Sequence, residues 1–263
     1  MKNVLVVGSN GGMGRAVCKL LIEKGFSVFG LDFQGVAENG VDFFNVDLTN
    51  ETSVVSAFEQ IKQKTDNLFA IVFVSGVYDL DSLIEMKEEN FVHVFNVNLF
   101  GLFRVNKIFA PLLKKGSRVL ITSSELAPLD PLPFTGVYAI SKSAVEKYAF
   151  SLRHELNLLG VSVSVIRPGA VKTSLLNVSQ KALDDFCEKT TFFKVNAKKF
   201  KQIVDSVENK NVSPEKIANV VLKCLLSKKP KFVYNLNRNF LLRVLNALPS
   251  KLQVFIISKI LKP

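Results

Sequence analysis

The sequence is poor in residues that bind metals or form disulfides. Its 263 residues include two histidines and three cysteines. Cys18, Cys187 and Cys224 have no metal-ligand spacing, and His93 and His154 are isolated. We therefore expect no metal site, and we expect both histidines to be structural or solvated. An odd number of scattered cysteines also argues against a disulfide framework and favours a reducing compartment.

Long apolar runs, internal repeats and low-complexity tracts are lacking too. A helix that crosses a bilayer needs about 20 apolar residues, and no such run occurs. The first strand-like run begins at residue 4, so we expect no signal peptide. These absences predict a cytoplasmic protein. With 48% hydrophobic and 22% charged residues, the chain can bury one core.

Acidic residues are scarce in the last 70 residues. Residues 194–263 hold 15 Lys and Arg against 3 Asp and Glu, whereas residues 1–193 are almost balanced. Residues 239–248 and 250–261 are two basic amphipathic helical patterns. Two readings stay open: contact of 239–261 with a membrane surface, or packing on the body or a partner subunit as a cap over a pocket. No nucleic-acid-reading motif is present, so we expect no nucleic-acid partner.

Strand-like and helical segments alternate along the chain. This pattern predicts an α/β fold with a doubly wound parallel sheet of Rossmann type. We expect residues 1–234 to form one domain and residues 235–263 a basic helical extension. The expected strands are 4–7, 27–31, 41–46, 69–74, 117–122, 161–166 and 232–234, and the expected helices are 12–24, 51–64, 86–114 and 138–158. Residues 34–40 are expected to be a loop.

A glycine-rich turn follows the first expected strand. The turn reads Gly8-Ser9-Asn10-Gly11-Gly12-Met13-Gly14, and a helical pattern comes after it. Glycines let a backbone approach a pyrophosphate, and a helix N-terminus supplies N–H groups to it. The strand, turn and helix together predict a dinucleotide-binding site.

Asp32 ends the second expected strand. A carboxylate there can accept hydrogen bonds from an adenine-ribose diol and repels a 2′-phosphate, which favours NAD over NADP. Gly11 places no basic side chain beside it, and we expect Arg15 to point to solvent. Asp47, after the third expected strand, could hold the adenine amine or cap the helix at 51–64.

Tyr138 and Lys142 lie four residues apart in an expected helix, so they share one face. A unit charge about 4 Å away contributes roughly 4 kcal/mol at an effective dielectric of about 20. Lys142 could thus lower the phenol pKa by about two to three units, toward the range of an acid–base catalyst. A hydroxyl from Ser123 or Ser124 could hold a substrate oxygen nearby.

Several motifs in one order resemble the short-chain dehydrogenase/reductase family over about residues 3–230. The family implies a doubly wound parallel sheet, NAD(P), and hydride transfer between nicotinamide and an alcohol or ketone carbon. The motifs are the glycine turn, Asp32, Asp47-Leu48-Thr49, Ser75-Gly76, Asn98, Ser123-Ser124, Tyr138-x-x-x-Lys142 and Pro168-Gly169.

The resemblance assigns catalytic roles to four residues. It implies that Tyr138 gives and takes the proton, while Lys142 lowers its pKa and holds the nicotinamide ribose. Asn98, which fits better than the nearby Asn96, resembles the helix-bending asparagine that supports a water relay to the lysine. Ser124 resembles the substrate-orienting serine. It precedes the tyrosine by 14 residues where the family usually has 13, which keeps Ser123 open as the alternative.

The resemblance also assigns cofactor contacts. Val74 stands where the family commonly has asparagine, so the adenosine-side contacts should differ in detail. Residues 168–173 resemble the segment that fixes the nicotinamide carboxamide. The expected cofactor-binding residues are Gly8, Asn10, Gly12, Met13, Gly14, Asp32, Asp47, Leu48, Ser75, Gly76, Tyr138, Lys142, Pro168, Gly169, Val171 and Thr173.

Residues 174–213 stand where the family has its variable substrate lid. Their apolar side chains, with four lysines between 194 and 201, favour an apolar substrate that could carry an anionic end. The basic extension resembles those of membrane-associated members that act on steroids, retinoids and other lipids. By the same resemblance, the helices at 90–114 and 138–158 form a homodimer or homotetramer face.

Two other functions are compatible with a dinucleotide-binding fold. A nucleotide-sugar epimerase or dehydratase generally has another glycine spacing and a longer C-terminal domain. A cofactor-bound sensor or scaffold without turnover often lacks the tyrosine or the lysine, and both are present. The sequence therefore favours an NAD-dependent alcohol/ketone oxidoreductase that acts on a hydrophobic substrate.

Overall fold

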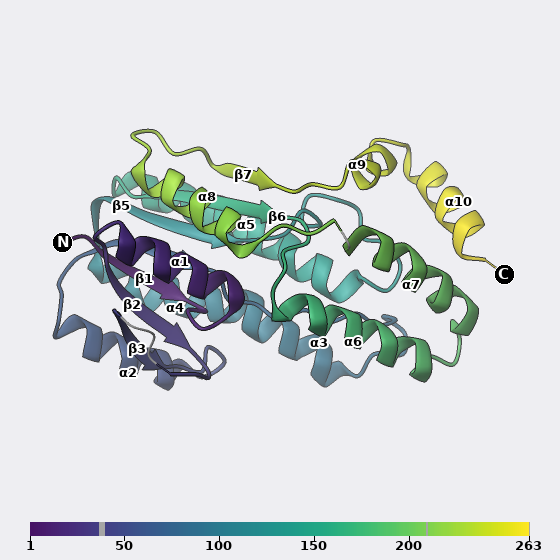
Figure 1. Cartoon of the computed structure of the whole chain (residues 1–263), viewed down its shortest axis with the longest axis horizontal. Coiled ribbons are helices and arrows are strands. Elements are labelled where there is room, and N and C mark those ends of the chain that lie inside the picture. Colours follow the sequence, from purple (N-terminus) through teal and green to yellow (C-terminus); the bar gives the residue numbers. More distant parts are fainter. Residues whose placement is uncertain (37–39, 209, 263) are drawn as a thin grey trace.

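A seven-stranded parallel sheet forms the centre of the molecule in the computed structural model (Figure 1). The structure describes residues 1–36, 40–208 and 210–262, with all their side chains except those of residues 174, 175, 177, 207 and 208. The strand order is β3-β2-β1-β4-β5-β6-β7. The strands are β1 (Asn3–Val7), β2 (Ser27–Asp32), β3 (Val41–Asn45), β4 (Leu68–Phe73), β5 (Leu113–Thr122), β6 (Ser162–Pro168) and β7 (Val233–Leu236).

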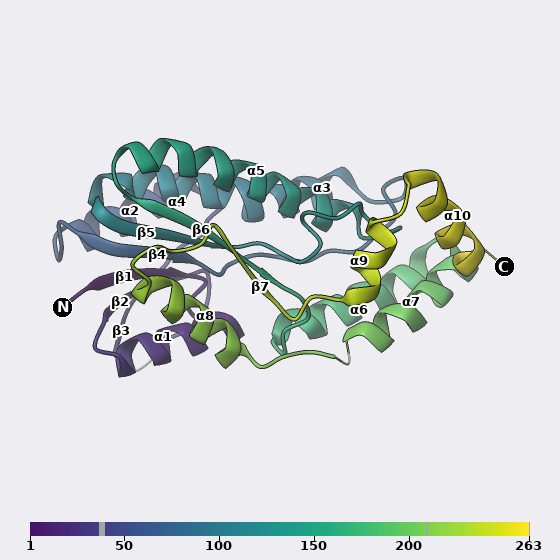
Figure 2. The same ribbon diagram turned by 90° about the horizontal axis from the view of Figure 1, so that it is seen from above.

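Helices cover both faces of the sheet (Figure 2). One face carries α1 (Gly12–Glu23) and α8 (Pro214–Leu226), and the other carries α2 (Glu51–Lys62), α4 (Leu102–Phe109) and α5 (Gly136–Leu158). Alternate strand residues supply the two cores: Leu5 and Val7 of β1 face one, whereas Val4 and Val6 face the other. The predicted doubly wound α/β fold is confirmed.

The helix predicted over 86–114 is interrupted. It is α-helical at α3 (Glu88–Phe95), becomes a π-helix at η1 (Asn96–Gly101), returns to α-helix at α4, and ends in a 3₁₀ turn at η2 (Ala110–Leu112). The inserted π turn is a feature that hydrophobic spacing does not reveal. The strand β5 begins at Leu113, four residues earlier than predicted, and α8 was not predicted.

Two further helical pairs lie beyond the carboxyl ends of the strands. The expected lid contains α6 (Ser174–Lys189) and α7 (Lys194–Glu208). The extension contains α9 (Phe240–Asn246) and α10 (Ser250–Leu261), which lies beside α7 in both views (Figures 1 and 2). Residues 37–39 of the predicted 34–40 loop, and residue 209 of the lid, lie outside the described residues.

The extension packs on the body. Asn196 Nδ2 of α7 donates to Leu261 O at 2.9 Å, and Leu261 joins an apolar cluster with Phe134 and Phe200. Asn246 Oδ1 accepts from the backbone N–H of Asp130 at 2.8 Å. Of the readings left open for this segment, packing over the body is therefore observed.

Candidate active site

Two adjoining cavities open at the carboxyl edge of the sheet. The larger, of about 590 Å³, is lined by the glycine turn and Asp32. The smaller, of about 220 Å³, is lined by Ser124, Tyr138 and Lys142. They share the wall formed by Met13, Val74, Ser75, Gly76, Tyr78 and Thr173. In open parallel sheets this edge is where ligands bind, so both cavities belong to one candidate site.

The glycine turn is packed too closely for side chains at Gly8, Gly12 and Gly14. Gly8 has φ +88°, and a Cβ built on Gly14 would lie 1.9 Å from Gly8 O. A Cβ on Gly12 would lie 2.9 Å from Thr173 Cγ2. The turn opens directly into α1, whose first residues line the larger cavity and leave backbone N–H groups without helical partners. This cradle fits the pyrophosphate of a dinucleotide.

Asp32 supports the turn as well as lining the cavity. Its Oδ2 accepts from the backbone N–H of Asn10 at 2.8 Å, and its Oδ1 accepts from that of Phe33 at 2.8 Å. Each carboxylate oxygen retains a second lone pair for a ribose hydroxyl. The Arg15 side chain is exposed, but its Nε donates to Asn10 O at 2.8 Å, so it bends back to the turn instead of pointing away.

Asp47 and Leu48 do not line either cavity in the described structure. Asp47 Oδ1 accepts from the backbone N–H and the hydroxyl of Thr49, at 2.8 and 2.7 Å. The alternative that Asp47 caps α2 is wrong, because Asn50 is the N-cap and accepts from Ser53 N. Leu48 is buried in the core.

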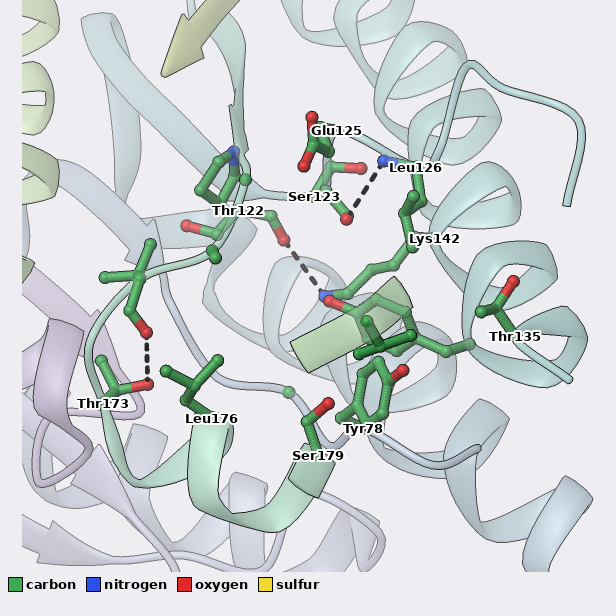
Figure 3. Close-up of a pocket in the computed structure, with 18 of the residues that line it drawn as sticks. Tyr78, Thr122, Ser123, Glu125, Leu126, Thr135, Lys142, Thr173, Leu176 and Ser179 are labelled. Carbon is green, nitrogen blue, oxygen red and sulfur yellow. Dashed lines mark hydrogen bonds between the residues drawn. The ribbon is translucent and has the colours of Figure 1, made fainter. Parts of the chain in front are cut away.

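Tyr138 and Lys142 lie one turn apart near the start of α5, and both are buried. Lys142 Nζ lies 5.7 Å from the centroid of the Tyr138 ring and donates to Thr122 O at 3.4 Å (Figure 3). The Tyr138 hydroxyl hydrogen-bonds the Ser124 hydroxyl, and the Tyr78 ring packs 4.7 Å from the Tyr138 ring. The prediction that Tyr138 and Lys142 share one helix face is confirmed.

The pKa of Tyr138 departs from the sequence prediction. Burial raises its pKa to about 12, although the hydrogen bond with Ser124 opposes that shift. Burial also lowers the pKa of Lys142 to about 8. The predicted shift rests on the attraction between the two side chains, but the loss of water around them has the larger effect on the pKa of Tyr138. The phenol is therefore protonated at neutral pH.

Asn98 lies in the π turn and is 1% exposed. Its Oδ1 accepts from Val77 N at 2.8 Å, while its Nδ2 donates to Val77 O at 3.0 Å and to Ser141 Oγ at 3.1 Å. A Cβ built on Gly76 would lie 3.1 Å from both Asn98 Oδ1 and Lys142 Nζ. The asparagine therefore joins the loop after β4 to α5 directly beside the lysine.

Ser123 and Ser124 both line the smaller cavity. Ser124 Oγ accepts from Leu126 N at 3.2 Å and contacts the Tyr138 hydroxyl. Ser123 Oγ is buried and has no hydrogen-bond partner among the described residues. Ser124 is thus the serine that shares a hydrogen bond with the tyrosine.

The segment that follows β6 forms the opposite wall. It is held by hydrogen bonds from Gly169 N to Leu236 O at 2.8 Å and from Lys172 N to Val212 O at 2.8 Å. A Cβ on Gly169 would lie 2.0 Å from Asn237 O, so glycine is required there. The lining residues of this segment are Pro168, Gly169, Ala170, Val171 and Thr173.

Several lining residues were not predicted from the sequence, and three of them bear on the chemistry of the site. Tyr78 packs on Tyr138, Glu125 directly follows Ser124, and Leu242 of α9 lines the smaller cavity. Glu125 was visible as an acid next to Ser124, but nothing in the sequence placed it against the extension. The lysines between 194 and 201 are not among the lining residues, so they give no support to an anionic substrate end.

A parallel sheet with a glycine-rich turn after its first strand, and two cavities at its carboxyl edge, is the architecture of Rossmann-type enzymes that use nicotinamide dinucleotides. The family model described as short chain dehydrogenase matches residues 2–184. The chain belongs to the short-chain dehydrogenase/reductase family, and it is an oxidoreductase with a nicotinamide cofactor.

Similar proteins come from animals and bacteria. The chain is 28% identical to the mouse short-chain dehydrogenase/reductase family 9C member 7, over 99% of this chain and 90% of that protein. It is 25% identical to a 3-ketodihydrosphingosine reductase of Bacteroides thetaiotaomicron, over 87% and 85%. It is 32% identical to mouse estradiol 17-beta-dehydrogenase 2, over 66% of this chain and 49% of that protein.

Solved structures agree with the fold. A short-chain dehydrogenase family protein from Francisella tularensis is 26% identical, with a TM-score of 0.74 over 90% of this chain and 96% of that one. Two structures with lower identity contain cofactors: one from Burkholderia cenocepacia with NADP (17%, TM-score 0.72, all of both chains) and one from Burkholderia phymatum with NAD (19%, TM-score 0.73, 88% of each).

A membrane-crossing helix and a metal site are both absent from the described residues. None of the helices found there combines the length and the apolarity that crossing a bilayer requires. Nor does any group of three or more His, Cys, Asp or Glu side chains in those residues have the placement of a metal site.

Proposed function

We propose that this oxidoreductase transfers hydride between nicotinamide and an alcohol or ketone carbon of a hydrophobic substrate, with Tyr138 as the acid and base. The observation that carries the proposal is the hydrogen bond between the Ser124 and Tyr138 hydroxyls on the wall of the smaller cavity. Two hydroxyls that converge at one point can both hold the reacting oxygen of a substrate.

The dinucleotide, when bound, supplies or accepts the hydride. Gly8, Gly12 and Gly14 would approach its pyrophosphate, and Lys142 would hold the nicotinamide ribose. In reduction, the protonated Tyr138 hydroxyl gives its proton to the carbonyl oxygen while Ser124 stabilises the developing charge. In oxidation the phenol must first ionise, which the Lys142 ammonium favours. Asn98 positions Lys142 through the loop after β4.

We further propose that NAD is preferred over NADP. The Asp32 carboxylate lines the larger cavity, where it would accept from the adenine-ribose diol and repel a 2′-phosphate. Arg15 lies on the other side of Asn10 and could offset part of that repulsion. Fluorescence titrations with NADH and NADPH give the two dissociation constants directly. Tighter binding of NADPH would overturn the preference.

The walls of the smaller cavity favour an apolar substrate. The loop after β5, the lid and α9 contribute seven of its apolar lining residues: Leu126, Leu132, Leu176, Phe200, Ile203, Val204 and Leu242. The names of two relatives, an estradiol dehydrogenase and a 3-ketodihydrosphingosine reductase, support a steroid-like or lipid-like substrate class.

Two exposed apolar surfaces support proposals about assembly and about membrane contact. Exposed aromatic side chains on α4 and α5, Phe103 and Phe150, would form the face of a homodimer or homotetramer. Exposed apolar side chains on α9 and α10 would contact a membrane surface as a peripheral association. Light scattering of the purified protein measures the first, and a monomer at micromolar concentration would rule out that assembly.

The central test replaces Tyr138 by phenylalanine. A panel of hydroxysteroids, retinoids, long-chain amino ketones, fatty alcohols and small ketones first identifies a substrate. Tyr138→Phe should then lose turnover by at least about a thousandfold while NADH binding changes little. Tyr148→Phe, ten residues along the same helix and packed against the core, is the matched control. Near-full turnover by Tyr138→Phe would overturn the assignment, and NADH binding without turnover across the panel would favour a scaffold.

A further inference from the structure

A carboxyl group is built into the wall of the smaller cavity. Glu125 directly follows Ser124 and is 8% exposed. Its backbone N–H donates to Pro168 O at 2.8 Å, which ties it to the segment that follows β6. Among the described lining residues, Glu125 and Lys142 carry the ionisable charges, and Lys142 lies beside Gly76 on the cofactor side. Glu125 is therefore the charged group that a substrate would meet.

The two oxygens of Glu125 have different surroundings. Oε2 accepts from the backbone N–H of Asn239, the N-cap of α9, at 2.5 Å. Oε1 lies beside Gly169, because a Cβ built there would come within 2.8 Å of it. Within the described part of the chain no hydrogen bond to Oε1 is found. Gly169 and Glu125 both line the smaller cavity, and Oε1 is the carboxylate oxygen left for a ligand.

No cation of the described protein neutralises this carboxylate. Arg238 attracts it, but the two groups form no ion pair within 4.0 Å. Desolvation outweighs that attraction and raises the pKa of Glu125. A buried carboxylate without a paired cation destabilises a protein, and a ligand cation at the same place would remove that cost.

We propose that Glu125 binds a protonated amine that the substrate carries on the carbon next to the reacting alcohol or ketone. The assignment rests on the proposed function, and it narrows the substrate class to an alkyl-chain amino alcohol or amino ketone. Ser124 would hold the reacting oxygen while its neighbour Glu125 takes the ammonium. The apolar lining from Leu132, Phe200 and Leu242 would take the alkyl chain. The carboxylate would repel fatty acids and other anionic substrates.

The test compares binding of two ligands that differ in one group. A twelve-carbon 2-amino-1,3-diol and the same 1,3-diol without the amine are titrated calorimetrically into the full-length protein with saturating NADH. The wild-type protein should prefer the amine by about thirtyfold or more, as expected for a charge-assisted hydrogen bond in a buried site. In Glu125→Gln, which keeps an acceptor for Asn239 N, that ratio should fall to within about threefold of unity.

Asp130→Asn is the matched control. Asp130 lies in the same loop, and its Oδ2 accepts from Gln253 of the extension at 3.1 Å, but it does not line the cavity. It should keep the amine preference, which separates recognition by Glu125 from loosening of the extension. Equal binding of both diols by the wild-type protein, or an unchanged preference in Glu125→Gln, would overturn the proposal.

A second measurement needs no variant. Dodecylamine, dodecanol and dodecanoate are compared as competitors of the amino diol, and the expected order of affinity is amine, alcohol, then carboxylate. Dodecanol or dodecanoate binding as tightly as the amine would overturn the inference even if Glu125→Gln did not fold. Both assays measure binding and not turnover. If the enzyme reduced neutral ketones but bound the amine no more tightly than its neutral counterpart, the role of Glu125 would be rejected and the proposed function would stand. Amine preference without any ketone or alcohol turnover would reject the proposed function instead.

Discussion

The Asn98 side-chain amide makes a pair of hydrogen bonds with the backbone of Val77, accepting from its N–H at 2.8 Å and donating to its C=O at 3.0 Å. The remaining Nδ2 hydrogen reaches Ser141 on α5. One buried side chain thus substitutes for strand pairing just beyond β4 and fixes the position of Gly76 against Lys142.

Replacing Asn98 by alanine should therefore affect stability and catalysis together. The backbone groups of Val77 would lose their partners in a half-buried place, which costs about 1–3 kcal/mol of unfolding free energy. The loop would also release Lys142, so kcat should fall. Urea denaturation and steady-state kinetics measure the two effects.

Asn96 provides the control, because it lies in the same π turn. Its Oδ1 accepts from Arg104 at 3.0 Å in a half-buried place. Asn96→Ala should change the unfolding free energy by less than about 1 kcal/mol and leave kcat within about twofold. If Asn96→Ala were the more damaging substitution, the choice of Asn98 over Asn96 as the positioning residue would be wrong.

The glycine turn makes a second prediction, on cofactor affinity. A Cβ on Gly14 would come within 1.9 Å of Gly8 O, whereas a Cβ on Gly11 would find its nearest neighbour, also Gly8 O, at 3.5 Å. Gly14→Ala should displace the turn and weaken NADH binding by at least about tenfold, which is 1.4 kcal/mol. Gly11→Ala meets an ordinary contact and should stay within about threefold. Equal losses in both variants would show that the close approach at Gly14 does not determine affinity.

Much of the fold was predictable because local patterns determined it. Apolar runs placed the strands, and the glycine turn placed the start of α1, since these features depend on neighbours in the chain. The π turn at 96–101 was not predictable. Within it, Asn98 hydrogen-bonds Val77 and Ser141, which lie 21 and 43 residues away. Long-range contacts of this kind leave no periodic signal.

The candidate site, like the fold, was predictable where it depends on local spacing and not where it depends on long-range contacts. The spacing of Tyr138 and Lys142 predicted that they share a helix face, which is correct. It could not predict how deeply both are buried, and burial reverses the expected direction of the tyrosine shift. Glu125 reaches Asn239 across 114 residues, so its place between cavity and extension required the tertiary structure.

The burial of Lys142 predicts how stability depends on pH. Its pKa is about 8 in the folded protein and near 10.5 when unfolded. Between these values the unfolded chain holds a proton that the folded protein has released, so the unfolding free energy rises with pH. Below pH 8 both states are protonated and the folded state carries the full desolvation cost. The gain between about pH 7.5 and 9.5 should be about 2 kcal/mol.

Lys142→Met isolates this contribution from the other titrating groups. Urea denaturation of both proteins at the two pH values gives the difference in unfolding free energy. The variant should be the more stable at about pH 7.5, and its advantage should shrink toward about pH 9.5 as the wild-type lysine loses its charge. It should also lose turnover. A constant difference between the two proteins across this range would contradict the lowered pKa.

The outer surface of the extension makes the last prediction, on membrane binding. Phe240 and Leu241 of α9 are 69% and 73% exposed, and Phe255 of α10 is 58% exposed. The helix α10 also carries Lys251 and Lys259. The opposite side of the same extension contributes Leu242 to the smaller cavity. Contact with a bilayer would therefore place the mouth of that cavity next to a lipid-like substrate.

Sedimentation with anionic liposomes tests this arrangement. The double variant Leu241→Ser, Phe255→Ser should weaken partitioning by at least about tenfold, because each apolar side chain contributes roughly 1–3 kcal/mol on burial. Leu158→Ser with Leu159→Ser removes two exposed leucines at the C-terminal end of α5, which lies at the opposite end of the molecule from α9 and α10 (Figure 2). This control should leave sedimentation unchanged. Neutral liposomes should bind the wild-type protein less, since lysines near an anionic surface contribute about 1 kcal/mol each. Equal sedimentation of both double variants would mean that α9 and α10 do not face the membrane, and that the extension acts only as a cap over the cavity.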